Sequence, residues 1–267
     1  MHVHLPFVSH ELKTPVGGLQ LLAEAVQDAA DDPEAVARFA ARMTTETRRL
    51  TSLVSEIIDL SRLQTSDPLT DMVIVDVAVC ADEAVEQTRL VAGLREVVAT
   101  PTDPPGQLRV YGDPELVTTA IRNLITNALN YSDDGTKVGV VVRRVDDVVE
   151  VSVSDQGRGI SAQDQERVFE RFYRVDPARS RITGGTGLGL SIVKHICANH
   201  GGEVTVWSQE GQGSTFTLRL PAIIDDTRPI GSPADGLGRH LTLAPDSAQP
   251  LILHDSQSPS TAREVSP

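Results

Sequence analysis

The sequence predicts an α+β protein in which an N-terminal helical hairpin precedes one mixed β-sheet with helices on one face. Apolar residues recur at helical spacing from Ser9 to about Leu63. A polar segment with a proline then marks a linker. Beyond it, strand-like and helix-like segments follow one another without strict alternation, which is typical of α+β domains. We therefore divide the chain into a hairpin at 1–64, a linker at 65–72, a sheet domain at 73–221 and a tail at 222–267.

Composition and charge exclude several classes of protein. With 267 residues, 40% of them apolar, the chain can form a core for each of two domains. The formal net charge of −13 argues against nucleic-acid binding, because a polyanion would be repelled. No apolar run reaches the length of a membrane span, and Met1–Pro6 lacks the pattern of a signal peptide. We expect the chain, as given, to be cytoplasmic and to make no membrane contact itself.

The hairpin is predicted to dimerise. Between its two apolar-periodic segments lies Asp31–Glu34, where Asp32 fits a helix cap and Pro33 fits the first helical turn. Two helices alone offer too little surface to bury their apolar stripe. Association of two hairpins into a four-helix bundle would bury it, so we expect a homodimer.

The sheet domain is predicted from alternating apolar segments and capped helices. A strand is expected at Val73–Val75, a helix at Ala78–Ala92, and a second helix capped by Asp113 with Pro114 in its first turn. Further strands are expected at 138–143, 149–153, 204–207 and 214–220, with an apolar helix at 190–198. Cys80 and Cys197 are far apart and are expected in the core. The tail at 222–267 is rich in Pro, Ser, Asp and Gly and is expected to be disordered.

The first candidate functional residue is a histidine near the start of the first helix. Histidine side chains generally titrate near neutral pH, so part of the His10 population is expected to be uncharged and nucleophilic. Glu11 can hydrogen-bond one ring nitrogen, and Thr14 shares the helical face of His10, where its hydroxyl can orient a water. Pro15 is expected to kink the helix. Taken alone, a histidine on a helix is more often an ordinary surface residue.

Two amides on the helix that opens at Asp113 form the second candidate group. Asn123 and Asn127 lie one turn apart, and amide oxygens can hold Mg²⁺ together with nucleotide phosphates. Taken by themselves, the two amides are better explained as ordinary polar residues on a helix surface. Tyr131, one turn further on, either stacks on a base or packs in the core.

Glycine-rich turns form the third group. Asp155 ends an alternating strand before Gly157 and Gly159, where its carboxylate can accept a hydrogen bond from an exocyclic amine such as that of adenine. The Gly184–Gly189 loop runs into an apolar helix, so its backbone amides and the helix N-terminus can bind phosphates. This loop lacks the lysine–serine ending of a Walker loop and the glycine spacing of a dinucleotide fold. A further glycine turn lies at 211–216.

An aromatic and basic segment accompanies these turns. In Phe169–Arg174 the aromatic side chains are expected to pack, while Arg171 or Arg174 reaches a phosphate. The polar stretch at 176–183 is expected to be a mobile lid.

Taken together and in this order, the segments resemble the motifs of the sensor histidine kinases of two-component systems. The His10 segment is similar to the H box and Asn123–Ala128 to the N box, while Asp155–Ile160, Phe169–Arg174 and Gly184–Leu190 are similar to the G1, F and G2 boxes. The match covers roughly residues 7–221. Each motif is modest, but their common order leaves little room for coincidence.

The resemblance implies a phosphotransfer hairpin followed by a Bergerat-type α/β sandwich that binds ATP. ATP would phosphorylate His10, and the phosphoryl group would pass to an aspartate in the receiver domain of a response regulator. Asn127 would coordinate Mg²⁺, Asp155 would bind the adenine amino group, and Thr14 would support phosphatase activity toward the regulator. The nucleotide-binding residues implied in this way are Asn123, Asn127, Tyr131, Asp155, Gly157, Gly159, Arg171, Arg174, Gly185, Thr186, Gly187, Leu188, Gly189 and Thr215.

One segment points to a subfamily. The segment 176–195 is similar to the phosphate-responsive sensor kinases of actinobacteria, which implies a winged-helix response regulator.

Other positions depart from the family pattern. The family usually has a phenylalanine where His4 stands, and Pro6 is expected to break the helix, so the start looks truncated. Upstream membrane segments and a sensor would anchor a full-length form in the membrane. Asn130 stands where the family often has a basic, phosphate-binding residue, which is expected to weaken nucleotide affinity.

Two other interpretations stay open. One is an ATPase or serine kinase of the same superfamily, in which a glutamate commonly acts as general base where this chain has Asn123. An amide cannot accept the proton, so steady hydrolysis should be slow. The other is a non-catalytic ATP-binding dimerisation module, in which His10 is inert because the helix is cut short at Pro6.

Overall fold

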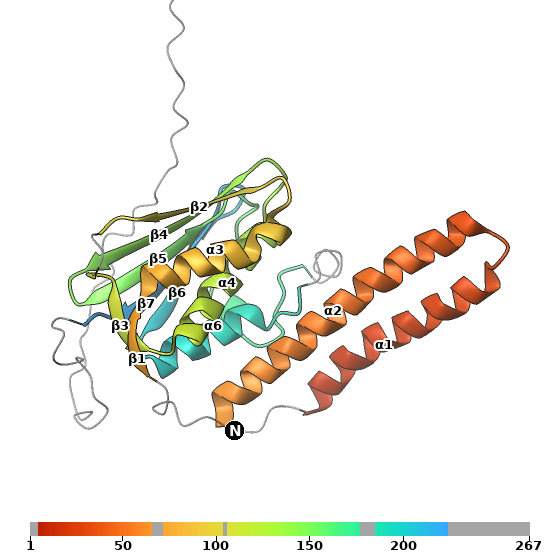
Figure 1. Ribbon diagram of the computed structural model, residues 1–267, viewed down its shortest axis with the longest axis horizontal. Helices are drawn as coiled ribbons and strands as arrows, with labels where there is room; N and C mark the ends of the chain where they lie inside the picture. Colours follow the sequence, from red (N-terminus) through yellow and green to blue (C-terminus); the bar gives the residue numbers. More distant parts are fainter. Residues whose placement is uncertain (1–4, 66–71, 104–105, 177–184, 224–267) are drawn as a thin grey trace, which may run out of the picture. The chain divides into compact units, whose positions relative to one another are not determined.

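A computed structural model describes residues 5–65, 72–103, 106–176 and 185–223 of the chain. It contains an N-terminal helical hairpin and an α/β sandwich, which confirms the predicted fold class (Figure 1). Among the helices of these residues, none combines the length and the apolar character that crossing a membrane requires. Residues 177–183 of the predicted lid and 224–267 of the predicted tail lie outside the described residues.

The hairpin consists of α1 (Leu5–Asp28) and α2 (Pro33–Thr65). Its connection has the predicted chemistry, because Asp32 Oδ1 accepts hydrogen bonds from the backbone N–H groups of Glu34 and Ala35, both at 3.1 Å. Leu53 and Leu60 of α2 are buried. Several apolar side chains of the two helices stay exposed, namely Val16, Leu21, Val54 and Ile58.

The predicted helix break at Pro6 is wrong. α1 begins at Leu5, four residues before the predicted start at Ser9, and it continues through Pro15. A proline in the first turn removes an N–H group that no helical carbonyl would accept, so Pro6 does not interrupt the helix. His10 therefore lies within α1, and Pro6 does not cut the helix short before it.

The sandwich is built on a five-stranded mixed sheet with the order β2-β4-β5-β7-β6. β2 runs parallel to β4, and the other neighbours are antiparallel. The strands are β2 (Glu96–Pro101), β4 (Lys137–Val145), β5 (Val148–Ser154), β6 (Glu203–Gln209) and β7 (Gly213–Pro221). Figure 1 shows α3 (Val77–Ala92), α4 (Pro114–Tyr131) and α6 (Gly189–Asn199) on one face of this sheet. Cys80 and Cys197 are buried as predicted.

A second, two-stranded sheet was not predicted. β1 (Val73–Asp76) pairs antiparallel with β3 (Arg109–Gly112), so the expectation of one sheet is wrong. β2, β3 and the short 3₁₀ helix η1 (Arg167–Phe169) were also missed. Ala222 and Ile223, the first two residues of the predicted tail, donate backbone hydrogen bonds to the carbonyl oxygens of Asp147 (2.8 Å) and Arg109 (2.9 Å).

His200 joins the C-terminal end of α6 to the turn before α4. Its Nδ1 lies 2.8 Å from the carbonyl oxygen of Ile196, and its Nε2 accepts the backbone N–H of Asp113 at 3.0 Å. Because the Asp113 N–H group is a donor, Nε2 carries no proton and the ring is neutral, with its hydrogen on Nδ1. Burial lowers the pKa of His200 below its ordinary value of 6.5.

We expect this contact to make folding stability depend on pH. The unfolded chain binds a proton at His200 more readily than the folded chain does. The contribution of His200 is therefore complete above pH 6.5 and is lost as the pH falls from 6.5 toward the folded pKa. Urea unfolding at pH 7.5 and 5.5 should show a smaller acid-induced loss in His200→Gln than in the wild type. His195→Gln is the matched control and should behave as wild type. Equal losses in all three proteins would contradict this role.

Candidate functional site

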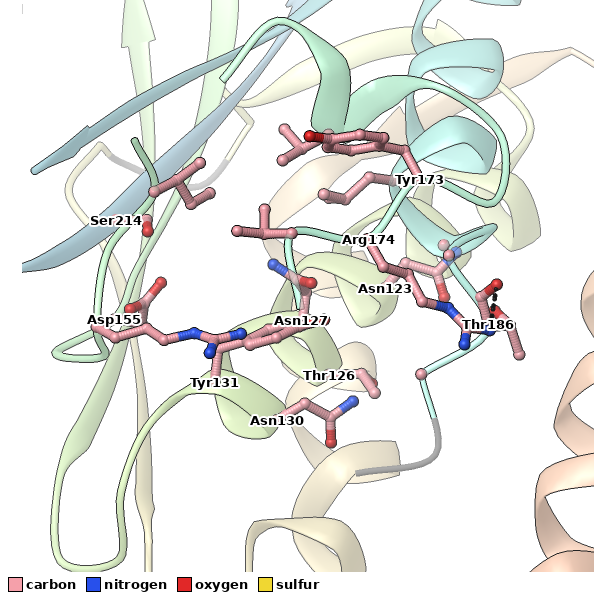
Figure 2. Close-up of a pocket in the computed structure, with 18 of the residues that line it drawn as sticks. Asn123, Thr126, Asn127, Asn130, Tyr131, Asp155, Tyr173, Arg174, Thr186 and Ser214 are labelled. Carbon is pink, nitrogen blue, oxygen red and sulfur yellow. Dashed lines mark hydrogen bonds between the residues drawn. The ribbon is translucent and has the colours of Figure 1, made fainter. Parts of the chain in front are cut away.

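A cavity lies between α4, the turn after β5 and the loop that precedes α6. Figure 2 shows Asp155 and Tyr131 on one side of it and Arg174 and Thr186 on the other, with Asn127 between them. Most of the predicted nucleotide-binding residues line this cavity, namely Asn123, Asn127, Tyr131, Asp155, Gly159, Arg174, Gly185, Thr186, Gly187 and Gly189.

α4 supplies the amides because its two faces differ in character. Ile121, Leu124 and Ile125 are fully buried in the core. Asn123 and Asn127, one helical turn apart, line the cavity instead. Thr126 and Asn130 line it too, although the sequence had not suggested Thr126. α4 therefore presents a row of polar side chains to whatever occupies the cavity.

Asp155 lies at the end of β5 and is almost completely buried. Its Oδ1 accepts the backbone N–H of Gly157 at 2.8 Å, and its own N–H donates to the carbonyl oxygen of Ser214 at 2.9 Å. Burial raises the pKa of Asp155 to about 6. A buried carboxylate with spare acceptor capacity, aimed into a cavity, suits a ligand that offers an N–H group.

Gly157 has a structural role at this turn rather than a direct one in the cavity. A Cβ at this position would lie 2.3 Å from the carbonyl oxygen of Tyr131. Only glycine therefore lets the turn after β5 approach the C-terminal end of α4. This close approach brings Asp155 and Tyr131 to the same part of the cavity.

The loop at 185–188 leads into α6 at the other side of the cavity. Thr186 Oγ1 accepts the backbone N–H of Leu188 at 3.2 Å, and an Arg174 N–H donates to the carbonyl oxygen of Thr186 at 2.9 Å. Gly189 and Leu190, at the first turn of α6, line the cavity. A helix N-terminus, a glycine loop and an arginine together favour an anionic group here.

Ser52 and Glu56 of α2 also line the cavity and were not predicted. The Thr186 hydroxyl donates a hydrogen bond to the Glu56 carboxylate, and the Ser52 hydroxyl donates to the same carboxylate at 3.1 Å. Burial raises the pKa of Glu56. An ionised Glu56 and an anionic ligand at the loop would repel each other in this arrangement.

The other predicted site residues lie elsewhere. Gly157, Arg171, Leu188 and Thr215 do not line the cavity: Arg171 is exposed and Leu188 is buried in the core. The Thr215 hydroxyl pairs with that of Ser154 at 2.9 Å, and its neighbour Ser214 lines the cavity instead. Thr14 is exposed on α1. His10 and Glu11 lie in α1, and their side chains are outside the described set.

Comparisons with known proteins match the hairpin and the sandwich to two known domain families. Residues 5–66 match the His Kinase A (phospho-acceptor) domain, and residues 112–224 match the family of histidine kinase-, DNA gyrase B- and HSP90-like ATPases. The sensor-like histidine kinase SenX3 of Mycolicibacterium smegmatis is 52% identical over 218 residues, which are 82% of this chain and 56% of that protein. The chain belongs to the sensor histidine kinases of two-component systems.

Other members of the histidine kinase family are also similar. SenX3 of Mycobacterium tuberculosis is 52% identical over 83% of this chain and 55% of its own length. The chain thus spans about half the length of these two relatives. The solved mycobacterial sensor histidine kinase MprB is 32% identical over 57% of this chain and 98% of that chain, with a TM-score of 0.50. The structure of full-length ShkA in complex with AMPPNP is 25% identical over 82% of this chain and 45% of that chain, with a TM-score of 0.59.

Proposed function

We propose that this chain is the catalytic core of a sensor histidine kinase. ATP phosphorylates the imidazole of His10, and the phosphoryl group is then transferred to an aspartate of a response regulator. The observation that supports this most directly is one cavity that combines a buried carboxylate, Asp155, with a row of amides and a glycine loop at a helix N-terminus. His10 lies in the segment that matches the phospho-acceptor domain.

The cavity residues fit the parts of ATP in a consistent order. Asp155 accepts the exocyclic amine of adenine, and Tyr131 lies beside it at the same end. Arg174, the loop at 185–188 and the first turn of α6 bind the phosphates at the other end. Transfer to His10 then depends mainly on position and charge stabilisation, as in phosphoryl transfer generally. Glu11 orients the His10 ring, and Thr14 supports dephosphorylation of the regulator.

Asn127 fits a magnesium site because an amide oxygen is a hard ligand and this residue lies between the two ends of the cavity. Among the described residues, no three His, Cys, Asp or Glu side chains gather into a metal-binding cluster. Asn127 is the residue of this chain that would hold Mg²⁺ beside the bound nucleotide. When bound, the ion neutralises charge on the phosphates. Asn123, an amide, offers no general base for water, which argues against a dedicated ATPase.

A histidine kinase core would have two protein partners, a second copy of the chain and a response regulator. The exposed apolar side chains Val16 and Leu21 of α1, with Val54 and Ile58 of α2, support a homodimer through the hairpin. A solved structure of similar fold is that of the histidine kinase ThkA in complex with the response regulator protein TrrA. We infer a receiver domain as acceptor here. The resemblance of residues 176–195 to the phosphate-responsive sensor kinases of actinobacteria leads us to propose a phosphate-responsive system with a winged-helix regulator.

Labelled ATP tests the proposal. Incubation with γ-labelled ATP and Mg²⁺ should label the wild type, and the label should be lost in acid and retained in base, because the P–N bond of phosphohistidine is acid-labile. His10→Ala should lose at least about 99% of the label, since the nucleophile is removed. His195→Ala, a histidine on α6, is the matched control and should keep wild-type labelling. Adding the receiver domain should transfer the label. Label that survives acid or persists in His10→Ala rules out His10 as the phospho-acceptor.

A further inference from the structure

Arg158 lines the same cavity at the end where Asp155 and Tyr131 lie, and neither the motif resemblance nor the proposed function gives it a role. Its guanidinium carbon lies 5.2 Å from the centroid of the Tyr131 ring, in a cation–π contact. The Arg158 side chain is about one-third exposed. It is therefore neither part of the core nor an ordinary surface arginine.

The backbone of Arg158 is fixed from two sides. The Gly157 N–H before it donates to Asp155 Oδ1, and the Arg158 carbonyl oxygen accepts the N–H of Gly211, in the β6–β7 turn, at 2.6 Å. The side chain thus starts from a defined point, three residues after the carboxylate that would bind the adenine amine. Because the backbone is held in place, the Arg158 side chain is better suited to a specific contact with a ligand than a side chain on a flexible loop would be.

One N–H group of the guanidinium has a carboxylate partner. Arg158 Nη1 donates to the Asp176 carboxylate at 3.4 Å, in a partly exposed ion pair. The guanidinium carbon also lies over the Tyr131 ring, at the end of the cavity with Asp155. Guanidinium groups stack on aromatic planes readily, since they are planar and weakly hydrated.

The second arginine of the cavity, Arg174, differs in both respects. It lies at the side with Thr186, away from Asp155, and donates to the Thr186 carbonyl oxygen at 2.9 Å. Among the described lining residues, the two arginines therefore lie apart, with Arg174 at the proposed phosphate end and Arg158 at the proposed base end.

From this geometry we infer that Arg158 is a base-stacking residue of the nucleotide site. The guanidinium, which lies over the Tyr131 ring, packs against the face of the purine, and Asp155 binds the edge of the same purine. The Asp176 carboxylate pairs with Arg158 Nη1 beside this position. The inference rests on the proposed binding of ATP and adds a specific contact to its adenine subsite.

A ligand series distinguishes stacking from phosphate binding. The dissociation constants of AMP, ADP and ATP should be measured by calorimetry for the wild type, Arg158→Ala, Arg158→Lys and Arg174→Ala. Arg158→Ala should weaken all three ligands by a similar factor of about 5- to 20-fold, which is the range of cation–π and base-stacking contacts. Arg158→Lys keeps the charge but not the plane and should resemble Arg158→Ala. Arg174→Ala is the contrast variant, whose loss should grow with the number of phosphates.

The results distinguish stacking by Arg158 from an effect of its charge and from a failure of the proposed nucleotide binding. A loss in Arg158→Ala that grows from AMP to ATP, or recovery in Arg158→Lys, means that Arg158 acts through its charge and overturns the stacking role. An unchanged affinity in Arg158→Ala overturns it as well. A wild type that binds none of the nucleotides contradicts the proposed function itself. Failure of His10 labelling with normal nucleotide affinities would leave the role of Arg158 intact.

Discussion

Replacing Asp155 with asparagine is expected to lower ATP affinity about 10- to 100-fold while making the nucleotide-free protein more stable at pH 7.5. The affinity falls because the amide places an N–H group where the adenine amine needs an acceptor, and a charge-assisted hydrogen bond contributes about 1.5–3 kcal/mol. The Asp155 Oδ1 acceptor for Gly157 can be replaced by the amide oxygen, so the turn is kept. Calorimetry gives the affinity, and urea unfolding gives the stability.

The stability gain follows from the sign of the pKa shift. Burial raises the folded pKa of Asp155 from 3.8 to about 6, so the ionised carboxylate destabilises the fold at pH values above 6. That cost disappears as the pH falls through 6 toward 3.8. A neutral amide removes most of this destabilisation, so we expect the free energy of unfolding of Asp155→Asn to be higher by about 1–2 kcal/mol at pH 7.5. The shift of about two pKa units sets the upper limit of this increase. The wild type should also bind ATP more weakly as the pH falls through about 6.

A surface variant provides the comparison for Asp155→Asn. The Asp134 side chain is 69% exposed and lies outside the cavity lining. Asp134→Asn should therefore change neither ATP affinity nor stability by more than about 0.5 kcal/mol. If Asp155→Asn keeps the wild-type affinity, the carboxylate does not bind the base. If it is less stable than the wild type at pH 7.5, burial is not the main cause of the raised pKa.

Gly213→Ala is expected to destabilise the protein by about 3–5 kcal/mol and to abolish nucleotide binding. Gly213 begins β7 with φ of +103°, and a Cβ there would lie 2.1 Å from the carbonyl oxygen of Asp155. The backbone at the end of β5 would have to move, and this movement would displace the Asp155 carboxylate. Strain in a left-handed conformation adds about 1–2 kcal/mol to that cost.

The same turn contains a matched control for this clash. Gly211 has φ of +78°, and no atom lies within 4 Å of a Cβ placed there. Gly211→Ala should therefore cost only about 1 kcal/mol, from backbone strain alone. Urea unfolding of both variants measures the difference directly. Equal destabilisation would show that the contact with Asp155 does not matter.

Local chemistry explains why most of the fold could be predicted. The Asp32 cap, the Asp113 cap and the alternation of β5 each depend on neighbouring residues, and all three are present. β3 has four residues, including an arginine and a glycine, and gives no alternating apolar signal. β2 lies at the edge of the sheet, where Val98 is exposed, so burial does not mark it in the sequence.

The site could be predicted where a regular element presents it. The helical spacing that identified Asn123 and Asn127 also includes Thr126, so this residue could have been found in the same way. On β7, Ser214 lines the cavity and Thr215 pairs with Ser154, because alternate strand residues point to opposite faces. The nucleotide contact of Thr215 stays a prediction. Glu56 reaches the cavity from α2 through a tertiary contact between distant segments, which spacing does not reveal. Arg158 lies within the Asp155–Ile160 segment that the sequence did identify, but a turn has no periodic spacing that would assign its side chain to the cavity.

His200 has a consequence for the ligand as well as for stability. α6 carries the cavity-lining residues Gly189 and Leu190 at its N-terminal end, and α4 carries Asn123 and Asn127 in its C-terminal half. His200 links the other ends of these two helices through its hydrogen bond to Asp113. A neutral imidazole that does not line the cavity thus joins the two helices that form two of its walls. Protonation of Nε2 would remove the acceptor for the Asp113 N–H group, so we expect acid to weaken this link.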